Sequence, residues 1–157
     1  METLCIRYGH PLWEKTIAFA RDSSWRAGPV LAERMERNGF QDWERVIAAA
    51  ENGSVVGYCT FTEQDELPEA YGYSPFIGFV FVEEGRRGKR ISQSMIEEAL
   101  RYAGSIGYET VYLMSGERGL YEKYGFTKLG DRETLHGTTD QLFQKTLSTQ
   151  PTERTTP

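Results

Sequence analysis

Residues 86–90 concentrate positive charge where a helix is predicted to begin. The cations are Arg86, Arg87, Lys89 and Arg90. Free backbone N–H groups and the helix dipole make a helix start an anion site, so cations there are unfavourable unless an anion binds. A bound polyphosphate would reverse that penalty, and Gly85 and Gly88 would let the backbone fold closely around it. The other interpretation is a solvated basic turn whose charge Glu83 and Glu84 offset, and the loop alone leaves both open.

The loop does not carry the common nucleotide-binding motifs. It contains neither the G-x-x-x-x-G-K-[ST] pattern of a nucleoside-triphosphate site nor the G-x-G-x-x-G pattern of a dinucleotide site. The net charge of the chain is −5, which argues against a nucleic-acid partner, because such binding needs a basic face. If the loop binds a phosphate, the ligand is therefore expected to be bound through neither of the two common nucleotide motifs.

Two apolar segments and an intervening helix would position this loop. Residues 76–82 are nearly all apolar, as in a strand covered on both faces, and residues 110–114 form a second such run. Between them, apolar residues recur at helical spacing over 91–106, and Gly107 is placed to end that helix. The segments predict a βαβ unit with parallel strands and a right-handed crossover. Gly78 indicates a bulge or a close approach to the backbone, or is a glycine merely tolerated there.

The rest of the chain extends this unit to a mixed α/β sheet with helices on its faces. The further predicted elements are strands at 4–7, 44–50 and 54–63, helices at 11–23, 29–37 and 119–124, and strands near 127–135 and 141–147. The last strand is expected at an exposed edge, where it could pair in a dimer, so a monomer and a homodimer both stay open. We expect one domain over 1–147 and a disordered polar tail over 148–157.

The composition indicates a folded protein of the cytoplasm. Hydrophobic residues make up 39% of the chain and aromatic residues 13%, which is typical of a globular protein. No apolar run approaches membrane-spanning length, and the first residues lack the apolar region of a signal peptide. Cys5 and Cys59 have no metal or redox spacing, so we expect reduced thiols, no metal and no membrane partner.

Two motifs bracket the predicted βαβ unit. One is Arg87-Gly88-Lys89-Arg90-Ile91-Ser92, and the other is the segment from Tyr121 to Phe126, which reads Tyr-x-x-x-Gly-Phe. Together they resemble the GNAT superfamily of N-acetyltransferases, in which a Q/R-x-x-G-x-G/A pattern after the fourth strand binds the pyrophosphate of coenzyme A. The close match spans 77–126. Arg90 and Ser92 stand where that pattern has small residues, and Arg90 would be tolerated if its backbone were already helical.

The resemblance implies a mixed, mostly antiparallel sheet with helices on both faces and the coenzyme site on the parallel βαβ unit. The two parallel strands would diverge, and the pantetheine arm of acetyl-CoA would pair with the freed edge of the first. A backbone N–H there would polarise the thioester carbonyl. The implied cofactor contacts are Phe81, Val82, Arg87, Gly88, Lys89, Arg90, Ile91, Ser92 and Ser115, the last as the nearest polar substitute for an asparagine of many members.

Acetyl transfer to an amine needs a neutral amine and a proton for the departing thiolate. Tyr121 is the predicted general acid, since a phenol with a pKa near ~10 can donate to a thiolate whose conjugate acid is near ~8.5. Its other interpretation is a ring that packs under the cofactor or in the core. The candidates for the general base are Glu63, Asp65, Glu66, Glu69 or a water molecule. His10 and His136 fall in no motif.

The resemblance thus predicts an acetyl-CoA-dependent N-acetyltransferase acting on a primary amine of a small molecule or a protein. The alternative is a non-catalytic acyl-CoA-binding sensor of the same fold, which the presence of Tyr121 disfavours. A nucleic-acid module that uses the basic loop is disfavoured by the acidity of the chain.

Overall fold

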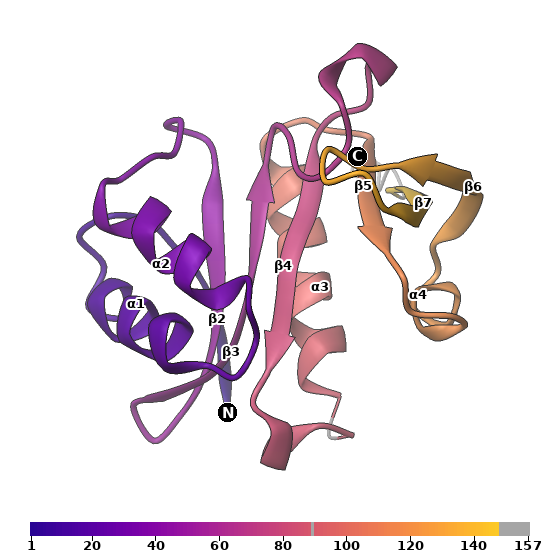
Figure 1. The fold of residues 1–157 in the computed structure, drawn as a ribbon. Coiled ribbons are helices and arrows are strands. Elements are labelled where there is room, and N and C mark those ends of the chain that lie inside the picture. Colours follow the sequence, from indigo (N-terminus) through magenta and orange to yellow (C-terminus); the bar gives the residue numbers. More distant parts are fainter. Residues whose placement is uncertain (89, 148–157) are drawn as a thin grey trace, which may run out of the picture.

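The strands form one twisted sheet that is interrupted between its fourth and fifth strands (Figure 1). The computed structural model describes residues 1–88 and 90–147, and its seven strands lie in the order β1-β2-β3-β4-β5-β7-β6. All neighbouring strands are antiparallel except β4 and β5, which are parallel. The predicted mixed, mostly antiparallel sheet is confirmed. The tail predicted over 148–157 lies outside the described residues.

Every predicted helix and strand within the described residues is present, with ends shifted slightly. The elements are, in chain order, β1 (Glu2–Ile6), α1 (Trp13–Asp22), α2 (Gly28–Glu36), β2 (Arg45–Glu51), β3 (Ser54–Thr62), the 3-10 turn η1 (Glu69–Tyr71), β4 (Phe76–Val82), the 3-10 turn η2 (Glu84–Arg86), α3 (Ile91–Ser105), β5 (Thr110–Ser115), α4 (Leu120–Lys123), β6 (Thr127–Glu133) and β7 (Thr139–Thr146).

Helices cover the two faces of the sheet. In Figure 1, α1 and α2 lie on one side of β2 and β3, and α3 lies on the other side. The apolar stripe of α3 is buried at Met95, Ile96 and Ala99, while Ile106, at the end of the predicted stripe, is 40% exposed. Cys5 and Cys59 are free thiols. Among the described residues, no helix is long and apolar enough to cross a membrane.

The parallel pair touches over a short length only. Phe76 pairs with Tyr112 and Ile77 with Leu113, after which the two strands diverge, as Figure 1 shows. The register between β3 and β4 shifts just beyond Gly78, and Phe79 has a positive φ of 51°. A bulge, one of the interpretations that Gly78 left open, is therefore present, and it bends β4 where the separation begins.

The prediction of an exposed edge at residues 141–147 is wrong. The corresponding strand, β7, lies between β5 and β6, and its register with β5 runs from Gln141 to Thr146. Its register with β6 runs from Thr139 to Gln144, and Leu142 and Phe143, whose side chains point to opposite faces, are fully buried. The outer strands of the sheet are β1 and β6.

Candidate active site

A cleft of about 930 Å³ opens where β4 and β5 diverge. Its lining comes from β4, the basic loop, the start of α3, the end of β5 and α4. Every predicted cofactor residue that the structure describes lines it, together with the predicted general acid: Phe81, Val82, Arg87, Gly88, Arg90, Ile91, Ser92, Ser115 and Tyr121. The predicted contact of Lys89 lies outside the described residues.

The edge of β4 that faces this cleft is open at Val82. The N–H of Glu83 donates to the carbonyl of Val56 in β3 at 2.9 Å. Because successive residues of a strand point to opposite sides, the N–H and C=O of Val82 point away from β3 and toward the cleft. The backbone of Phe81, opposite Tyr58, faces β3. Of the two predicted contacts in β4, Val82 offers its backbone and Phe81 its ring.

Two arginines of the loop have different surroundings. Arg87 donates from Nε to the carbonyl of Val82 at 2.9 Å, and its guanidinium carbon lies 5.4 Å from the centre of the Phe81 ring. Arg86 instead forms ion pairs with Glu51 and Glu83. Arg87 therefore lies along the open edge of β4, whereas the carboxylates of two neighbouring turns hold Arg86.

The backbone at the start of α3 differs from the expectation for Arg90. This residue precedes the helix with φ 61° and ψ 23°, in the left-handed region, so the helical backbone that would have made an arginine easy to accommodate is not present. Gly88 also has a positive φ, 86°. A second left-handed turn is what brings the chain into α3, and that turn explains why a glycine is common at the position of Arg90 in the resembling pattern.

Polar side chains tie the start of α3 and the end of β5 to their neighbours. The hydroxyl of Ser92 lies 2.8 Å from that of Tyr124, which connects α3 to α4 across the cleft. The hydroxyl of Ser115 accepts a hydrogen bond from the N–H of Glu117 at 2.9 Å. Ile91 is buried, with 4% of its surface exposed, so its part in the cleft is its backbone at the helix start.

Tyr121 lies in α4 against the core and lines the cleft. Its side chain is 4% exposed, and its ring packs against Tyr124, Phe126 and Phe143. Burial, helped by the nearby Cys59, raises the pKa of its phenol well above the ordinary value, so the hydroxyl keeps its proton at neutral pH. The ring thus has the packing role considered from sequence, and its placement also brings a protonated phenol to the site.

The four candidate carboxylates separate by position. Asp65 and Glu66 line the cleft, and Glu63 lines an adjoining cavity that Asp65 also lines. Glu69 lies exposed in η1 and belongs to the lining of neither. Burial, and then the charge of Glu66, raises the pKa of Asp65 to about 7. The pKa of Glu66 is also raised, by burial and by the charge of Asp140.

Asp65 lies directly over Gly78 of β4. A Cβ on that glycine would be 2.4 Å from Oδ1 of Asp65, which is closer than atoms can approach. The glycine is therefore required here by the close approach of the carboxyl, one of the interpretations that its place in an apolar strand left open. The result is a carboxyl at the point where β4 leaves β5.

Sequence reasoning missed two further residues of this part of the cleft. They are Glu117 and Asp140. Gln141 of β7 pairs with Ser115, the last residue of β5. This pairing brings the preceding residue, Asp140, to the end of β5. The amide of Gln141 donates to the carbonyl of Glu117 at 2.9 Å. No local pattern marks these residues, because only the order of the strands brings them together.

Comparisons with known proteins agree with this geometry. A family model described as "Acetyltransferase (GNAT) family" matches residues 12–126. The chain is similar in structure to an aminoglycoside 6'-N-acetyltransferase complexed with coenzyme A, with a TM-score of 0.71, 18% identity and 96% of this chain and 99% of that chain covered. An aminoglycoside 6'-acetyltransferase type Ii gives a TM-score of 0.75 and 21% identity over 96% of this chain and 100% of that one.

A third structure, the aminoglycoside 6'-N-acetyltransferase from Enterococcus faecium, gives a TM-score of 0.73 at 19% identity, over 96% of this chain and 99% of that chain. Among curated proteins, none matches the sequence significantly. At these identities the structural neighbours show a shared fold, and the family match, which covers most of the chain, shows the membership. The chain belongs to the acetyltransferase (GNAT) family.

Proposed function

We propose that this protein is an N-acetyltransferase that moves the acetyl group of acetyl-CoA to a primary amine of a small molecule or a protein, in the cytoplasm. The observation that carries the proposal is the meeting of four features in one cleft: the open edge at Val82, the basic helix start, the phenol of Tyr121 and the carboxyl of Asp65. Each feature matches one requirement of acetyl transfer to an amine.

Acetyl-CoA supplies an activated thioester, and the residues present fit its two polar parts. The N–H of Val82 points into the cleft and can polarise the thioester carbonyl. The C=O of Val82 accepts from Arg87 in this structure and would pair with an amide N–H of an extended pantetheine arm once Arg87 binds a phosphate. The backbone N–H groups at the start of α3, with Arg87 and Gly88, suit the pyrophosphate. Arg87 would then exchange the Val82 carbonyl for a phosphate oxygen.

Asp65 is the proposed general base. Its pKa of about 7 allows it to be ionised at neutral pH and still to accept a proton from a cationic amine. The freed nitrogen lone pair attacks the thioester carbonyl carbon and forms the C–N bond. Glu66, Glu117 and Asp140, which line the same part of the cleft, would attract a positively charged acceptor.

Tyr121 is the proposed general acid for the last step, in which the C–S bond breaks and the sulfur takes a proton. The raised pKa of the buried phenol means that the proton is present when needed. Burial disfavours a negative charge on a departing thiolate as well, so a proton from a neighbouring phenol is favoured there. Proton transfer therefore remains within reach of a single step.

Thiol release tests the proposal. Acetyl-CoA is offered together with a panel of amines, polyamines, aminoglycosides and peptides, and release of free coenzyme A is measured. We expect at least one amine to support turnover. Binding of acetyl-CoA without release for any amine would favour the alternative, a non-catalytic acyl-CoA-binding sensor of the same fold.

Tyr121→Phe tests the role of the phenol. Removing the hydroxyl should leave the affinity for acetyl-CoA unchanged and lower turnover at least about tenfold, because the thiolate would leave without its proton donor. Equilibrium binding and steady-state kinetics give the two values. Tyr108→Phe, which removes a hydroxyl from a partly buried tyrosine that does not line the cleft, is the matched control and should keep full turnover. Undiminished turnover of Tyr121→Phe would remove the assignment.

A further inference from the structure

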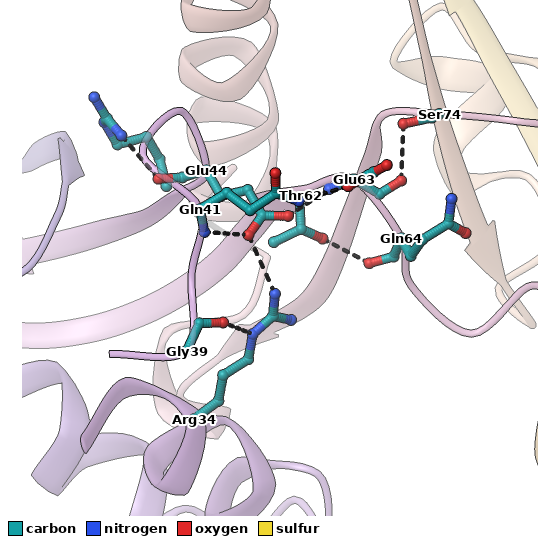
Figure 2. A network of polar contacts seen from close by, with 9 residues as sticks. Arg34, Gly39, Gln41, Glu44, Thr62, Glu63, Gln64 and Ser74 are labelled. Carbon is teal, nitrogen blue, oxygen red and sulfur yellow. Dashed lines mark hydrogen bonds and ion pairs between the residues drawn. The ribbon is translucent and has the colours of Figure 1, made fainter. Parts of the chain in front are cut away.

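Glu44 is a buried carboxylate outside the cleft that the proposed chemistry does not use. It is 4% exposed and precedes β2. Its two oxygens accept hydrogen bonds from the backbone N–H groups of Gln41 (2.8 Å) and Glu63 (2.7 Å), and Arg34 of α2 lies 3.4 Å away. Figure 2 shows these contacts converging on the carboxylate. Burying a charge is costly, and the fold does so here with each oxygen paired.

These contacts fix the chain as it leaves β3. The N–H of Glu63 is bound by Glu44, and the carbonyl of Glu63 accepts from Ser74 at 2.9 Å. The next carbonyl, that of Gln64, accepts from the hydroxyl of Thr62 at 2.7 Å (Figure 2). The following residue is Asp65. Residues 63 and 64 are therefore anchored through their backbones immediately before the proposed base.

Arg34 anchors the other side of this network. Its Nε donates to the carbonyl of Gly39 at 2.9 Å, and its guanidinium lies 4.4 Å from the centre of the Phe40 ring. Thr62, just before this segment, is the last residue of β3, and Asp65, just after it, lies over Gly78. Loss of the hydrogen bonds to Glu44 would therefore displace the carboxyl of Asp65. The space between Asp65 and β4 is narrow, because a Cβ at position 78 would lie 2.4 Å from Oδ1 of Asp65.

We infer that Glu44 is a positioning residue for the acetyl transfer: its carboxylate fixes residues 63–64 and thereby holds the carboxyl of Asp65 over Gly78 at the head of the cleft. The inference rests on the proposed role of Asp65. A displacement of about 1 Å at a reacting group can cost roughly a hundredfold in rate, so an anchor two residues away from the base acts on turnover without contact with a substrate.

Glu44→Gln tests the inference. The amide keeps the size of the side chain and can accept only one of the two backbone hydrogen bonds. We expect turnover to fall roughly ten- to a hundredfold with the KM for acetyl-CoA unchanged, since the coenzyme contacts lie elsewhere in the cleft. The double variant Arg34→Met/Glu44→Gln leaves no unpaired buried charge and covers the case in which the single variant does not fold.

The loss of turnover at unchanged KM is the readout that a purely structural role would not give, and the titration of Asp65 reports separately on the surroundings of its carboxyl. The charged groups that face Asp65 are Arg34 from α2 and Glu66 beside it, and Glu66 in turn faces Asp140 and His136. In Glu44→Gln, Arg34 loses its anionic partner and the segment is freer to reach water. Both changes lower the pKa of Asp65. A carbon-13 titration of its carboxyl should therefore show a lower pKa than in the unchanged protein.

Ile17→Val, a core change in α1 away from the segment, is the matched control for lost stability. Thermal stability, turnover and the Asp65 titration are compared between Glu44→Gln and this control. If all three agree, Glu44 only supports the fold and the inference is overturned. If no amine supports turnover in the unchanged protein, the proposed function fails by itself. The Asp65 titration and the amide exchange of Glu63 then still decide whether Glu44 positions the carboxyl.

Discussion

Arg90 holds a backbone conformation that arginine seldom adopts. Its φ of 61° is in the left-handed region, where a side chain costs about 1–2 kcal/mol. Glycine lacks that penalty, but its greater conformational entropy in the unfolded chain lowers the stability of the folded state by roughly 0.5–1 kcal/mol. Arg90→Gly should therefore raise the free energy of unfolding by about 0.5–1 kcal/mol, measured by urea denaturation. The affinity for acetyl-CoA should fall if the side chain contacts a phosphate.

Gly88→Ala is the opposite change two residues earlier. Its φ of 86° also lies in the left-handed region, and a Cβ there would meet no atom within 4 Å. Backbone strain should therefore be the main effect of Gly88→Ala and should lower the free energy of unfolding by about 1 kcal/mol. Equal stabilities for both variants and the unchanged protein would show that the loop is not held in this conformation in solution.

The raised pKa of Asp65 has a consequence for stability. The folded state holds this proton up to about pH 7, whereas the unfolded chain releases it near the ordinary pKa of 3.8. Between these values the unfolded state binds fewer protons, so the contribution of Asp65 to stability falls as pH rises through the window and stays low above it. Asp65→Asn should thus be more stable than the unchanged protein at about pH 8, with the difference shrinking toward about pH 4.

Urea denaturation across this pH range measures the free energy of unfolding of Asp65→Asn and of the unchanged protein. In the difference between the two values, the contributions of all other titrating groups cancel. The same variant should lose turnover, because an amide cannot accept the proton of the amine. A stability difference that does not change with pH would show that the carboxyl is not buried as described. If Asp65→Asn is more stable at about pH 8 and inactive, Asp65 exchanges stability for function, as active-site residues commonly do.

At the scale of the element, the bend in β4 depends on one missing side chain. Gly78→Ala would place a Cβ 2.4 Å from Oδ1 of Asp65, so the carboxyl or the strand must move. We expect a loss of about 1–3 kcal/mol in stability and a fall in turnover, measured by denaturation and thiol release. Gly85→Ala is the control, since a Cβ there would meet nothing within 4 Å. Full turnover of Gly78→Ala would exclude Asp65 as the base.

Elements with local signals were predictable from sequence. Asn52 and Gly53 have positive φ values of 51° and 82°, as their hairpin turn requires, and the apolar period of α3 marked its buried face. The cofactor side of the site lies within a single βαβ unit, so its residues could be named in advance. The position of β7 was not predictable, because no local pattern states which strand it joins, and Asp140 depends on that order.

The conformation of Arg90 was missed for another reason. An arginine gives no signal for a left-handed turn, and only the path from η2 into α3 demands one at that position. The choice among Glu63, Asp65, Glu66 and Glu69 was equally beyond the sequence. All four are neighbours in one polar loop, and their separation into cleft, adjoining cavity and surface depends on contacts with α2, β2 and β4.

At the scale of the whole molecule, the divergence of β4 and β5 leaves an interior edge in the middle of a sheet. Such an edge presents unpaired N–H and C=O groups, as outer strands do, but here inside a cleft with walls on both sides. An extended ligand with amide groups would serve as a short extra strand. The sheet would then be continuous only in the complex.

Acetyl-CoA should accordingly behave as a structural component as well as a reactant. At about 100 times its Kd it should stabilise the fold by about 2.7 kcal/mol, seen as a higher melting temperature. The amide of Val82 should exchange more slowly in the complex. 3'-Phosphoadenosine 5'-diphosphate, which keeps the pyrophosphate and lacks the pantetheine arm, should protect the start of α3 and leave Val82 unprotected. Equal protection by both ligands would show that the edge stays unpaired. In a cell, the supply of coenzyme would then set how much of this protein has a continuous sheet at any moment.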